Sequence, residues 1–294
     1  MLYSSVADIP FTLSDLPSQE LPRSILMVTP EHYQVEYVLN PYMKGNIGSV
    51  DQAEAHVQWS SLRRSYLALG IGVNNIRGVA GSPDMVFAAN QTLPGLDSRG
   101  GRRVLLSNMA DEVRRSEVDH FGTFFLDHGY DVVRLSAGTK LEGCGDGIWH
   151  HDLRLLWCGH GFRSDPTAFE ESCALFDVPG NLLELRDEAF YHLDTCLAVI
   201  NRDTALWVRS AFSPGSVEIL ERLIPHLIEV PLHEAGSLLA CNAHSPDGKT
   251  VVIQSGCDET NMLLRSAGFS VKEVDTSEFL KAGGSVFCMK QMYW

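Results

Sequence analysis

The chain has 294 residues, of which 45% are hydrophobic and 20% charged, as is typical of a globular protein. Its formal net charge of −14 argues against a nucleic-acid or anionic-membrane partner, because binding phosphate groups requires a basic face. Seven cysteines, an odd number without a C-x-x-C pair, favour neither a disulfide framework nor a zinc site, so a reducing cytoplasm is the simplest compartment.

The first 24 residues are predicted to form an irregular arm. Proline, serine and aspartate punctuate them, and they lack the basic start and continuous apolar run of a secretory signal. No apolar run elsewhere is long enough for a transmembrane helix. From residue 25, where a first strand is expected, to residue 294 there is no low-complexity linker and no shift in composition. We therefore expect one domain over residues 25–294.

Hydrophobic residues at helical spacing predict helices over residues 51–69 and 112–128. A third helix is expected over 258–267, and shorter ones near 166–176 and 215–223. Glycine follows each of the three longer helices, where a left-handed residue commonly ends a helix. The spaced apolar residues are Trp59, Leu62, Tyr66 and Leu69 in the first helix and Val118, Phe121 and Phe125 in the second.

One pattern recurs five times along the chain. A helical stretch leads into a short strand, and a further strand follows whose start or middle carries polar or reactive residues. Each unit therefore has the approximate order strand, strand, helix, strand, and five such units suggest a ring of repeats around one shared site. The lead-in strands are predicted at 69–73, 129–133, 180–184, 226–230 and 268–272, and other short strands at 103–106, 153–157, 204–208 and 250–253.

Each unit offers a different reactive or hydrogen-bonding group in the strand after the lead-in. Carboxylates, a histidine and a cysteine around one centre are the parts of an enzyme with a thiol nucleophile. In chain order these groups are Asp84 and Asn90, Glu142 and Asp146, His192 and Asp194, Asn242 and His244, and Cys288.

Cys288 follows the paired glycines Gly283 and Gly284, which let the backbone turn tightly or approach a ligand. Cys288 is therefore a candidate nucleophile. The alternative is that it serves only as a small buried hydrophobic residue. His192 and Asp194, two positions apart on a predicted strand, would project from the same face as a general acid/base with a nearby carboxylate. The alternative is a histidine hydrogen-bonded at a strand edge.

Glu142 and Asp146 alternate with glycines in a predicted turn. The segment lacks the Lys-Ser/Thr ending of a phosphate loop, and its acids would repel phosphate. Two carboxylates in such a turn suit a cation, either a metal or a guanidinium, and the alternative is a solvated acidic turn.

Several stretches stand in an order that resembles the guanidino-group-modifying, or amidinotransferase-like, superfamily, and within it the arginine dihydrolase branch. The resemblance extends from about residue 25 to the end of the chain. It implies an α/β fold, the five-bladed α/β propeller (pentein), built of five ββαβ-like repeats with pseudo-fivefold symmetry. The matching stretches are residues 30–33, 37–41, 44–47, 83–90, 142–146, 156–164, 190–196 and 278–284, the last leading to Cys288.

The resemblance implies catalytic roles for four residues. Cys288 would be the nucleophile that attacks the guanidinium carbon, and His192 the acid/base that protonates departing ammonia and then activates water. Glu142 and Asp194 would grip the guanidinium through paired charged hydrogen bonds.

Six further residues are expected to bind the substrate. Arg114 and Arg163 align with arginines that hold the substrate carboxylate. Asn40 and Asn90 align with asparagines of the dihydrolase site, and position 90 is usually aspartate in arginine deiminases and dimethylarginine hydrolases. The set is completed by Asp84 and Asp146.

The expected function is hydrolysis of the L-arginine guanidinium to ornithine, ammonia and carbon dioxide through a covalent thiouronium, without metal or organic cofactor. The alternatives are an arginine deiminase, which stops at citrulline, a dimethylarginine dimethylaminohydrolase, an amidinotransferase, and an inactive arginine-binding protein. Departures from the dihydrolase pattern, at Ser82 and at Gln91-Thr92, flank the site and leave the substrate open. The sequence is also compatible with a homo-oligomer.

Overall fold

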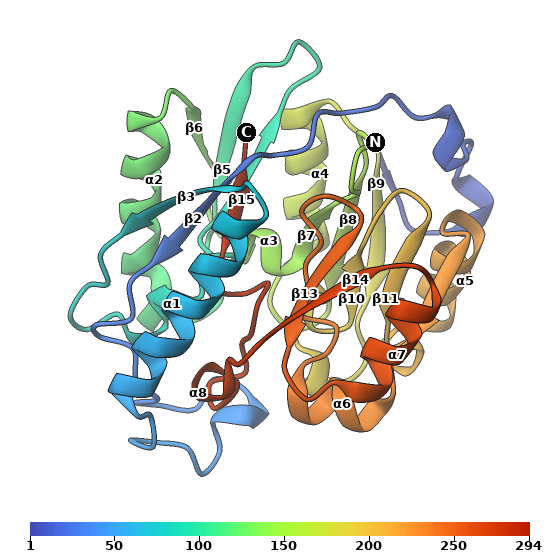
Figure 1. The fold of residues 1–294 in the computed structure, drawn as a ribbon. Coiled ribbons are helices and arrows are strands. Elements are labelled where there is room, and N and C mark those ends of the chain that lie inside the picture. Colours follow the sequence, from blue (N-terminus) through green and yellow to red (C-terminus); the bar gives the residue numbers. More distant parts are fainter.

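The computed structural model describes all 294 residues, and its strands form five separate sheets (Figure 1). Four sheets share one order, in which a short strand lies antiparallel to a second strand that runs parallel to a third. They are β15 (Gln291–Tyr293), β2 (Ser24–Val28) and β3 (Gly72–Ile76); β4 (Thr92–Leu96), β5 (Arg102–Leu106) and β6 (Asp131–Arg134); β7 (Gly147–Trp149), β8 (Leu156–His160) and β9 (Gly180–Glu184); and β10 (Leu197–Val199), β11 (Thr204–Trp207) and β12 (His226–Glu229).

In the fifth sheet, β13 (Thr250–Gln254) runs parallel to β14 (Ser270–Val274). An isolated antiparallel bridge between His244 and Val252 takes the place of the short strand. The predicted order of elements is thus confirmed along the chain in three units. The first sheet takes its short strand from near the end of the chain, and the fifth keeps only a bridge at that place. The first sheet joins β15, near the end of the chain, to β2 near its start, so the two ends of the chain meet in one sheet.

One helix connects the two parallel strands of each sheet, because parallel neighbours need a crossover connection. Helices α1 and α2 flank one side of the molecule, and α5 and α7 the other (Figure 1). The crossover helices are α1 (Gln52–Ala68), α2 (Val118–Asp127), α4 (Pro166–Phe176), α5 (Pro214–Leu223) and α7 (Asp258–Ser266), and the short helices are α3 (Gly143–Asp146), α6 (Leu232–Leu238) and α8 (Ser277–Leu280).

Three lead-in strands begin two or three residues later than predicted. The glycines that end α1, α2 and α7 have φ of +78°, +78° and +91°, so the chain reverses there. The following residue donates its backbone N–H back to the helix, which delays the strand. These bonds are Ile71 to Tyr66 at 3.1 Å, Tyr130 to Phe125 at 3.0 Å and Phe269 to Leu264 at 3.0 Å.

Two other predicted boundaries were wrong for local reasons. The helix predicted over 112–128 begins with the 3₁₀ helix η5 (Glu112–Glu117), and α2 starts only at Val118. The strand predicted at 153–157 is β8, which starts at Leu156 because Leu153 forms an isolated bridge with Ser18 of the arm.

The reactive residues do not lie on strands, as the sequence predicted, but on turns just before them. Short helical turns precede β4, β7 and β10, and Cys288 lies in a turn before β15. These turns are η4 (Pro83–Val86), α3 and η7 (Leu193–Thr195), and the polar side chains that they carry project from the ends of four different sheets toward one region.

The first 24 residues contain little regular structure but are packed on the rest of the chain. Strand β1 (Leu2–Tyr3) lies parallel to β9, and the 3₁₀ turns η1 (Val6–Asp8) and η2 (Leu13–Asp15) follow it. Leu13 is buried in the largest hydrophobic cluster. The arm therefore adds an edge strand and apolar contacts to the third sheet and its neighbours.

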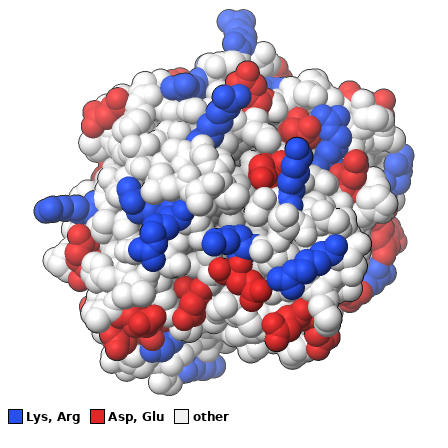
Figure 2. All heavy atoms as spheres, viewed as in Figure 1, with Lys and Arg blue, Asp and Glu red and all other residues white.

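Lysine, arginine and acidic side chains are interspersed on the face seen in Figure 2. The acidic excess of the sequence is therefore spread over this face, together with basic groups, rather than separated from them. Among the helices, none has both the length and the apolar character that crossing a membrane requires.

We expect Gly129→Ala to lower the free energy of unfolding by about 1 kcal/mol, because alanine resists the left-handed conformation at this helix end. The matched control is Gly236→Ala within α6, where an added Cβ meets nothing within 4 Å. That change should stabilise by about 0.5–1 kcal/mol. Urea unfolding of both variants measures the difference, and equal effects of the two substitutions would contradict this account.

Candidate active site

A small cavity lies where the turns before the short strands meet. Seven of the residues predicted from the sequence line it: Asn40, Asp84, Asn90, Arg114, Arg163, His192 and Cys288. The other lining residues are Leu39, Met43, Phe87, Tyr191, Ala282, Gly283 and Gly284. Glu142, Asp146 and Asp194 do not line the cavity. Glu142 and Asp194 contact the lining residues His192 and Cys288, and Asp146 binds the backbone of Leu193, next to His192.

The Cys288 thiol is 3% exposed and lies between two polar side chains. Its Sγ is 3.2 Å from Asp194 Oδ2, and Asn242 Nδ2 donates to Sγ at 3.1 Å. Burial, followed by the negative charge of Asp194, raises the pKa of Cys288 well above its ordinary value. Both effects favour the protonated thiol, and a cation beside it would favour the thiolate.

Asn242 organises the backbone around the thiol. Its Oδ1 accepts hydrogen bonds from the N–H groups of Ser285 at 3.2 Å and Cys288 at 3.1 Å. Its Nδ2 also donates to the backbone oxygen of Asp194 at 3.0 Å. Sequence reasoning placed Asn242 among the reactive groups of the fourth unit but gave it no place in the site. Asn242 occupies the same place in the fourth unit as the site residues do in the other units. That equivalence was the signal in the sequence that could have assigned it to the site.

Asp194 is fully buried, and its carboxylate is only partly paired. Oδ2 contacts the thiol, whereas Oδ1 has no hydrogen-bond partner. Burial raises the pKa of Asp194 to about 6, although the His192 charge opposes this rise. The group can therefore accept a proton near neutral pH more readily than an ordinary aspartate.

His192 and Asp194 do not share a strand face, because residues 193–195 form the 3₁₀ helix η7 and His192 is its N-cap. His192 Nε2 instead lies 2.7 Å from Glu142 Oε2. Burial disfavours the charged imidazole, but the charges of Asp146 and Glu142 outweigh it and raise the pKa of His192. The predicted pairing of His192 with Asp194 is therefore wrong, and Glu142 takes the place of that carboxylate.

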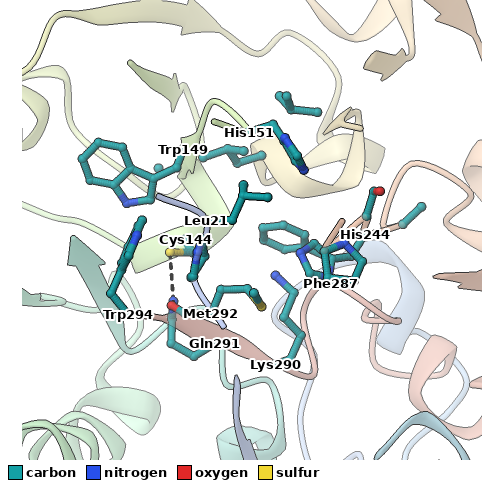
Figure 3. A pocket seen from close by; sticks show the side chains of 17 residues that line it. Leu21, Cys144, Trp149, His151, His244, Phe287, Lys290, Gln291, Met292 and Trp294 are labelled. Atoms are coloured by element: carbon teal, nitrogen blue, oxygen red, sulfur yellow. Dashed lines mark hydrogen bonds between the residues drawn. The ribbon is translucent and has the colours of Figure 1, made fainter. Parts of the chain in front are cut away.

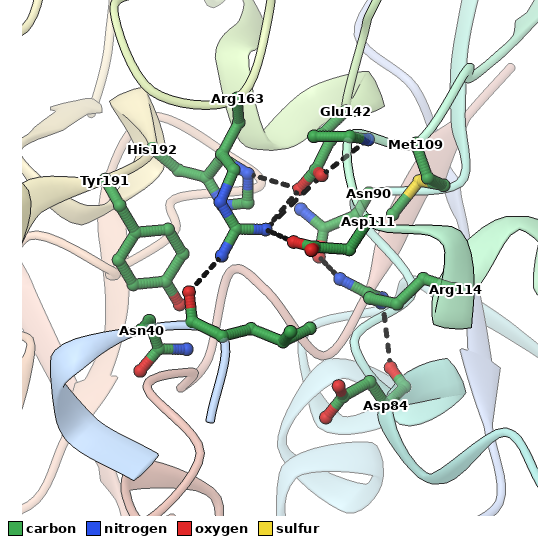
Figure 4. A network of polar contacts seen from close by, with 12 residues as sticks. Asn40, Asp84, Asn90, Met109, Asp111, Arg114, Glu142, Arg163, Tyr191 and His192 are labelled. Carbon is green, nitrogen blue, oxygen red and sulfur yellow. Dashed lines mark hydrogen bonds and ion pairs between the residues drawn. The ribbon is translucent and has the colours of Figure 1, made fainter. Parts of the chain in front are cut away.

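Glu142 is buried between His192 and Arg163 (Figure 4). Arg163 Nη1 lies 3.3 and 3.2 Å from its two carboxylate oxygens. Burial acts to raise the pKa of Glu142, but the hydrogen bond from His192 and the charge of Arg163 dominate and lower it. Arg163 also donates to the Leu39 backbone oxygen at 2.9 Å, and its guanidinium stacks 5.0 Å from the centre of the Tyr191 ring.

Arg114 forms the second charged group of the cavity, and it is 4% exposed. It pairs with Glu117 at 3.0 Å and donates to Asn90 Oδ1 at 3.0 Å and to the Asp84 backbone oxygen at 3.1 Å. The Nδ2 group of Asn90 has no partner. Arg114 therefore fixes the orientation of Asn90 and leaves its amide N–H groups free.

Asp84 is the least satisfied carboxylate of the cavity. Its side chain is buried and neither oxygen has a hydrogen-bond partner. Burial raises the pKa of Asp84, although the Arg114 charge and the nearby Tyr37 hydroxyl, which does not reach hydrogen-bonding geometry, oppose this. A buried carboxylate without partners costs free energy, which a cationic ligand in the cavity would recover.

Asn40 and the paired glycines shape the cavity wall. Asn40 Oδ1 caps the turn η3 (Pro41–Met43), and its Nδ2 donates to Ala282 at 2.9 Å. Gly283 has φ of +80°, and a Cβ there would lie 2.8 Å from Asn40 Oδ1. A Cβ on Gly284 would lie 2.2 Å from Phe87. The close approach predicted for the glycine pair is thus confirmed, and its partners are protein side chains.

Asp146 supports this arrangement from behind. Its oxygens accept hydrogen bonds from Ser164 Oγ at 2.7 Å and from the Leu193 N–H at 3.0 Å. It thereby fixes the turn that carries His192. No group of three or more His, Cys, Asp or Glu side chains is arranged to hold a metal ion. The cavity combines a thiol, a histidine–glutamate pair and unpaired buried carboxylates, which suits covalent catalysis on a cationic substrate.

Comparison with known proteins gives consistent matches. The model of a family described as eukaryotic N,N dimethylarginine dimethylhydrolase matches residues 40–292. ArgZ of Synechocystis, a bifunctional arginine dihydrolase/ornithine cyclodeaminase, is 35% identical over 267 residues, which are 90% of this chain. The chain spans 37% of the length of that relative. A dimethylarginine dimethylaminohydrolase of Mycobacterium tuberculosis is 36% identical over 274 residues, 92% of this chain and 87% of the relative.

The crystal structure of the N-terminal domain of ArgZ, bound to substrate, has a TM-score of 0.86 and 34% identity, covering 92% of this chain and 97% of that one. The α/β fold is therefore shared with that domain. The expected membership of the guanidino-group-modifying superfamily, close to arginine dihydrolase, is confirmed. Because the matching segment contains all ten predicted site residues and most of the chain, this protein belongs to the dimethylarginine dimethylhydrolase family.

Proposed function

We propose that this protein hydrolyses the guanidinium group of L-arginine to ornithine, ammonia and carbon dioxide. The observation that carries the proposal is a buried Cys288 thiol at 3.2 Å from Asp194, in a cavity lined by His192, which is paired with Glu142. The substrate-bound domain of ArgZ, an arginine dihydrolase, supports it through its TM-score of 0.86 over 97% of that domain. Asparagine at position 90 also favours the dihydrolase.

Binding of the guanidinium is the first step that the unpaired carboxylates support. Asp84 and Asp194 offer oxygens without partners, so a planar cation between them would complete their hydrogen bonds. Arg163 and Arg114 line the cavity and are the candidates for the substrate carboxylate. In the empty site Glu142 acts through His192, and its expected contact with the guanidinium requires Arg163 to turn away.

The cation then allows the thiol to react. Cys288 loses its proton, for which Asp194 is the nearest acceptor, and Sγ forms a bond to the guanidinium carbon. His192 gives a proton to one nitrogen, which leaves as ammonia and produces the thiouronium. Water, deprotonated by His192, attacks the same carbon, and Sγ departs, which yields citrulline. General acid/base catalysis of this type contributes roughly 10²–10⁴-fold.

A second cycle acts on the ureido group before it escapes. Sγ adds to the ureido carbon, the second ammonia leaves, and water releases a carbamate that breaks down to ornithine and carbon dioxide. In total one arginine and two waters give ornithine, two ammonia and one carbon dioxide. Asn90 lines the cavity without adding a negative charge, whereas a carboxylate there would repel the oxygen of the neutral ureido group.

The architecture of the catalytic unit is part of the same proposal. We interpret the five sheets as blades of a five-bladed propeller with pseudo-fivefold symmetry, with the polar turns at its centre. Residues 25–294 then form one catalytic domain, and residues 1–24 an arm that joins the third blade. Seven free cysteines support a reducing cytoplasm as its compartment.

The second candidate function is hydrolysis of dimethylarginine. The family model over residues 40–292 and the Mycobacterium tuberculosis relative at 36% identity favour it. Its products would be citrulline and dimethylamine, and an arginine deiminase would instead give citrulline and ammonia from arginine. The identity of the product therefore separates all three reactions.

Incubation of the purified protein with L-arginine should give ornithine with two ammonia per arginine, measured by mass spectrometry. Cys288→Ser should abolish turnover, because a hydroxyl is a far weaker nucleophile. Cys257→Ser is the matched control, since Cys257 is the N-cap of α7, a position that favours serine. Citrulline as the end product from arginine would indicate an arginine deiminase instead. Release of dimethylamine from dimethylarginine, without turnover of arginine, would indicate a dimethylarginine hydrolase.

Asn90→Asp should shift the product from ornithine toward citrulline. The added carboxylate would still accept from Arg114 but would repel the oxygen of the neutral ureido group, which favours release of citrulline after one cycle. The ornithine-to-citrulline ratio is the measured quantity. Asn201→Asp is the control, because the Asn201 side chain only accepts backbone N–H groups that aspartate also accepts. An unchanged ratio in the first variant would refute this role for Asn90.

Asp194→Asn should increase alkylation of Cys288 by iodoacetamide at neutral pH while lowering turnover. Asp194 raises the pKa of the thiol through its negative charge, so loss of that charge lowers this pKa and populates the thiolate. Each unit of pKa changes the thiolate fraction about tenfold. Peptide mass spectrometry gives the alkylation rate, with exposed Asp203→Asn as control. Slower alkylation than in the parent would mean that Asp194 promotes the thiolate instead.

A further inference from the structure

A second cavity lies on the other side of the segment that carries Cys288. Cys288 lines the catalytic cavity, whereas Phe287, Lys290 and Gln291 line the second one. The second cavity has a volume of about 80 Å³ and the catalytic cavity about 20 Å³. The second cavity is therefore the roomier of the two, and the proposed reaction does not use it.

An unpaired ammonium projects into this second cavity. Lys290 is 2% exposed, and its Nζ forms neither a hydrogen bond nor an ion pair. Nζ lies only 3.3 Å from the centre of the Phe287 ring and points toward the middle of the lining side chains (Figure 3). The charge of Asp194 acts on Lys290 from the other side of the segment, but no carboxylate lines this cavity. A buried ammonium without an anionic partner in contact costs free energy.

Neutral polar groups beside Lys290 are also without partners. Ser245 Oγ and Gln291 Oε1 are buried, and neither has a hydrogen-bond partner. His151 Nε2, which lines the same cavity, is unpartnered too. Buried polar atoms are nearly always paired in folded proteins, so several unpaired ones around one cavity indicate that something polar occupies it.

The remaining walls of this cavity are apolar. Trp149 and Trp294 meet edge to face with ring centres 6.0 Å apart. Their indole N–H groups already donate to the backbone oxygens of Pro94 at 2.8 Å and Glu20 at 2.6 Å. Both indoles therefore offer only carbon surface to a ligand, as does Met292 beside them (Figure 3).

We propose that the second cavity binds a small carboxylate with an apolar body. The carboxylate would lie against Lys290 Nζ and the Ser245 hydroxyl, and the body against Trp149 and Trp294. Burial lowers the pKa of Lys290 to about 7, and a carboxylate partner would restore its charge. Arginine does not fit this description, since its cationic end would meet the apolar walls and the ammonium.

The test is direct binding of 3-phenylpropionate to the full chain, measured by isothermal titration and ligand-observed NMR. The uncharged 3-phenylpropionamide, of the same shape, should bind at least about tenfold more weakly, because it cannot pair with the ammonium. Lys290→Met should weaken binding of the acid by about tenfold or more, and Lys249→Met, at an exposed lysine, should leave it unchanged. If Lys290→Met does not fold, Ser245→Ala takes its place, with weaker binding again expected.

A competition experiment separates the two cavities. In Cys288→Ser protein, which should not turn arginine over, saturating L-arginine should leave 3-phenylpropionate bound. Displacement by arginine would place the probe in the catalytic cavity and overturn the proposal. Absence of binding to folded parent protein, equal binding of acid and amide, or full affinity in folded Lys290→Met would also overturn it. None of these readouts depends on which reaction the protein catalyses.

Discussion

Burial of carboxylates without enough cationic partners is the constraint on which the site depends. Asp84 and the Oδ1 atom of Asp194 are left unpaired, whereas Glu142 and Glu117 are neutralised by Arg163 and Arg114. The paired carboxylates keep the arginines and the histidine in place, and the unpaired ones create a demand for a cation. Burial, together with the negative charge of Asp194, raises the pKa of the Cys288 thiol. Binding of a guanidinium would thus neutralise the unpaired carboxylates and, at the same time, favour the thiolate form of Cys288.

Such an arrangement needs a rigid backbone, because turns and not strands carry the reactive groups. Asn242 binds the N–H groups on both sides of the nucleophile turn, and Asp146 holds the turn of His192. Asn40 connects its own turn to the backbone at Ala282. Each connection runs between different sheets. The positions of side chains from distant parts of the sequence are therefore set by hydrogen bonds between sheets and not only within each unit.

The order of the elements, most helices and the residues around the cavity could be predicted from the sequence, because hydrophobic spacing, glycine ends and the superfamily motifs are local signals. Strand starts after Gly70 or Gly129 could not, since they depend on hydrogen bonds back to the helix. Nor could the pairing of His192 with Glu142, which lies 50 residues away. We predicted that His192 and Asp194 share one face because we expected a strand there. Residues 193–195 instead form a 3₁₀ turn, so the two side chains do not share a face.

The antiparallel pairing of β15 with β2 has a consequence for how the protein is made. During synthesis β2 leaves the ribosome early, with one edge facing no partner until residues 291–293 follow. The turn that carries Cys288 immediately precedes β15, so the thiol reaches Asn242 and Asp194 only when β15 pairs with β2. A nascent chain would then carry no reactive centre. Until β15 is in place, the unpaired edge of β2 can pair with a strand of another chain. Aggregation at this stage therefore competes with completion of the fold.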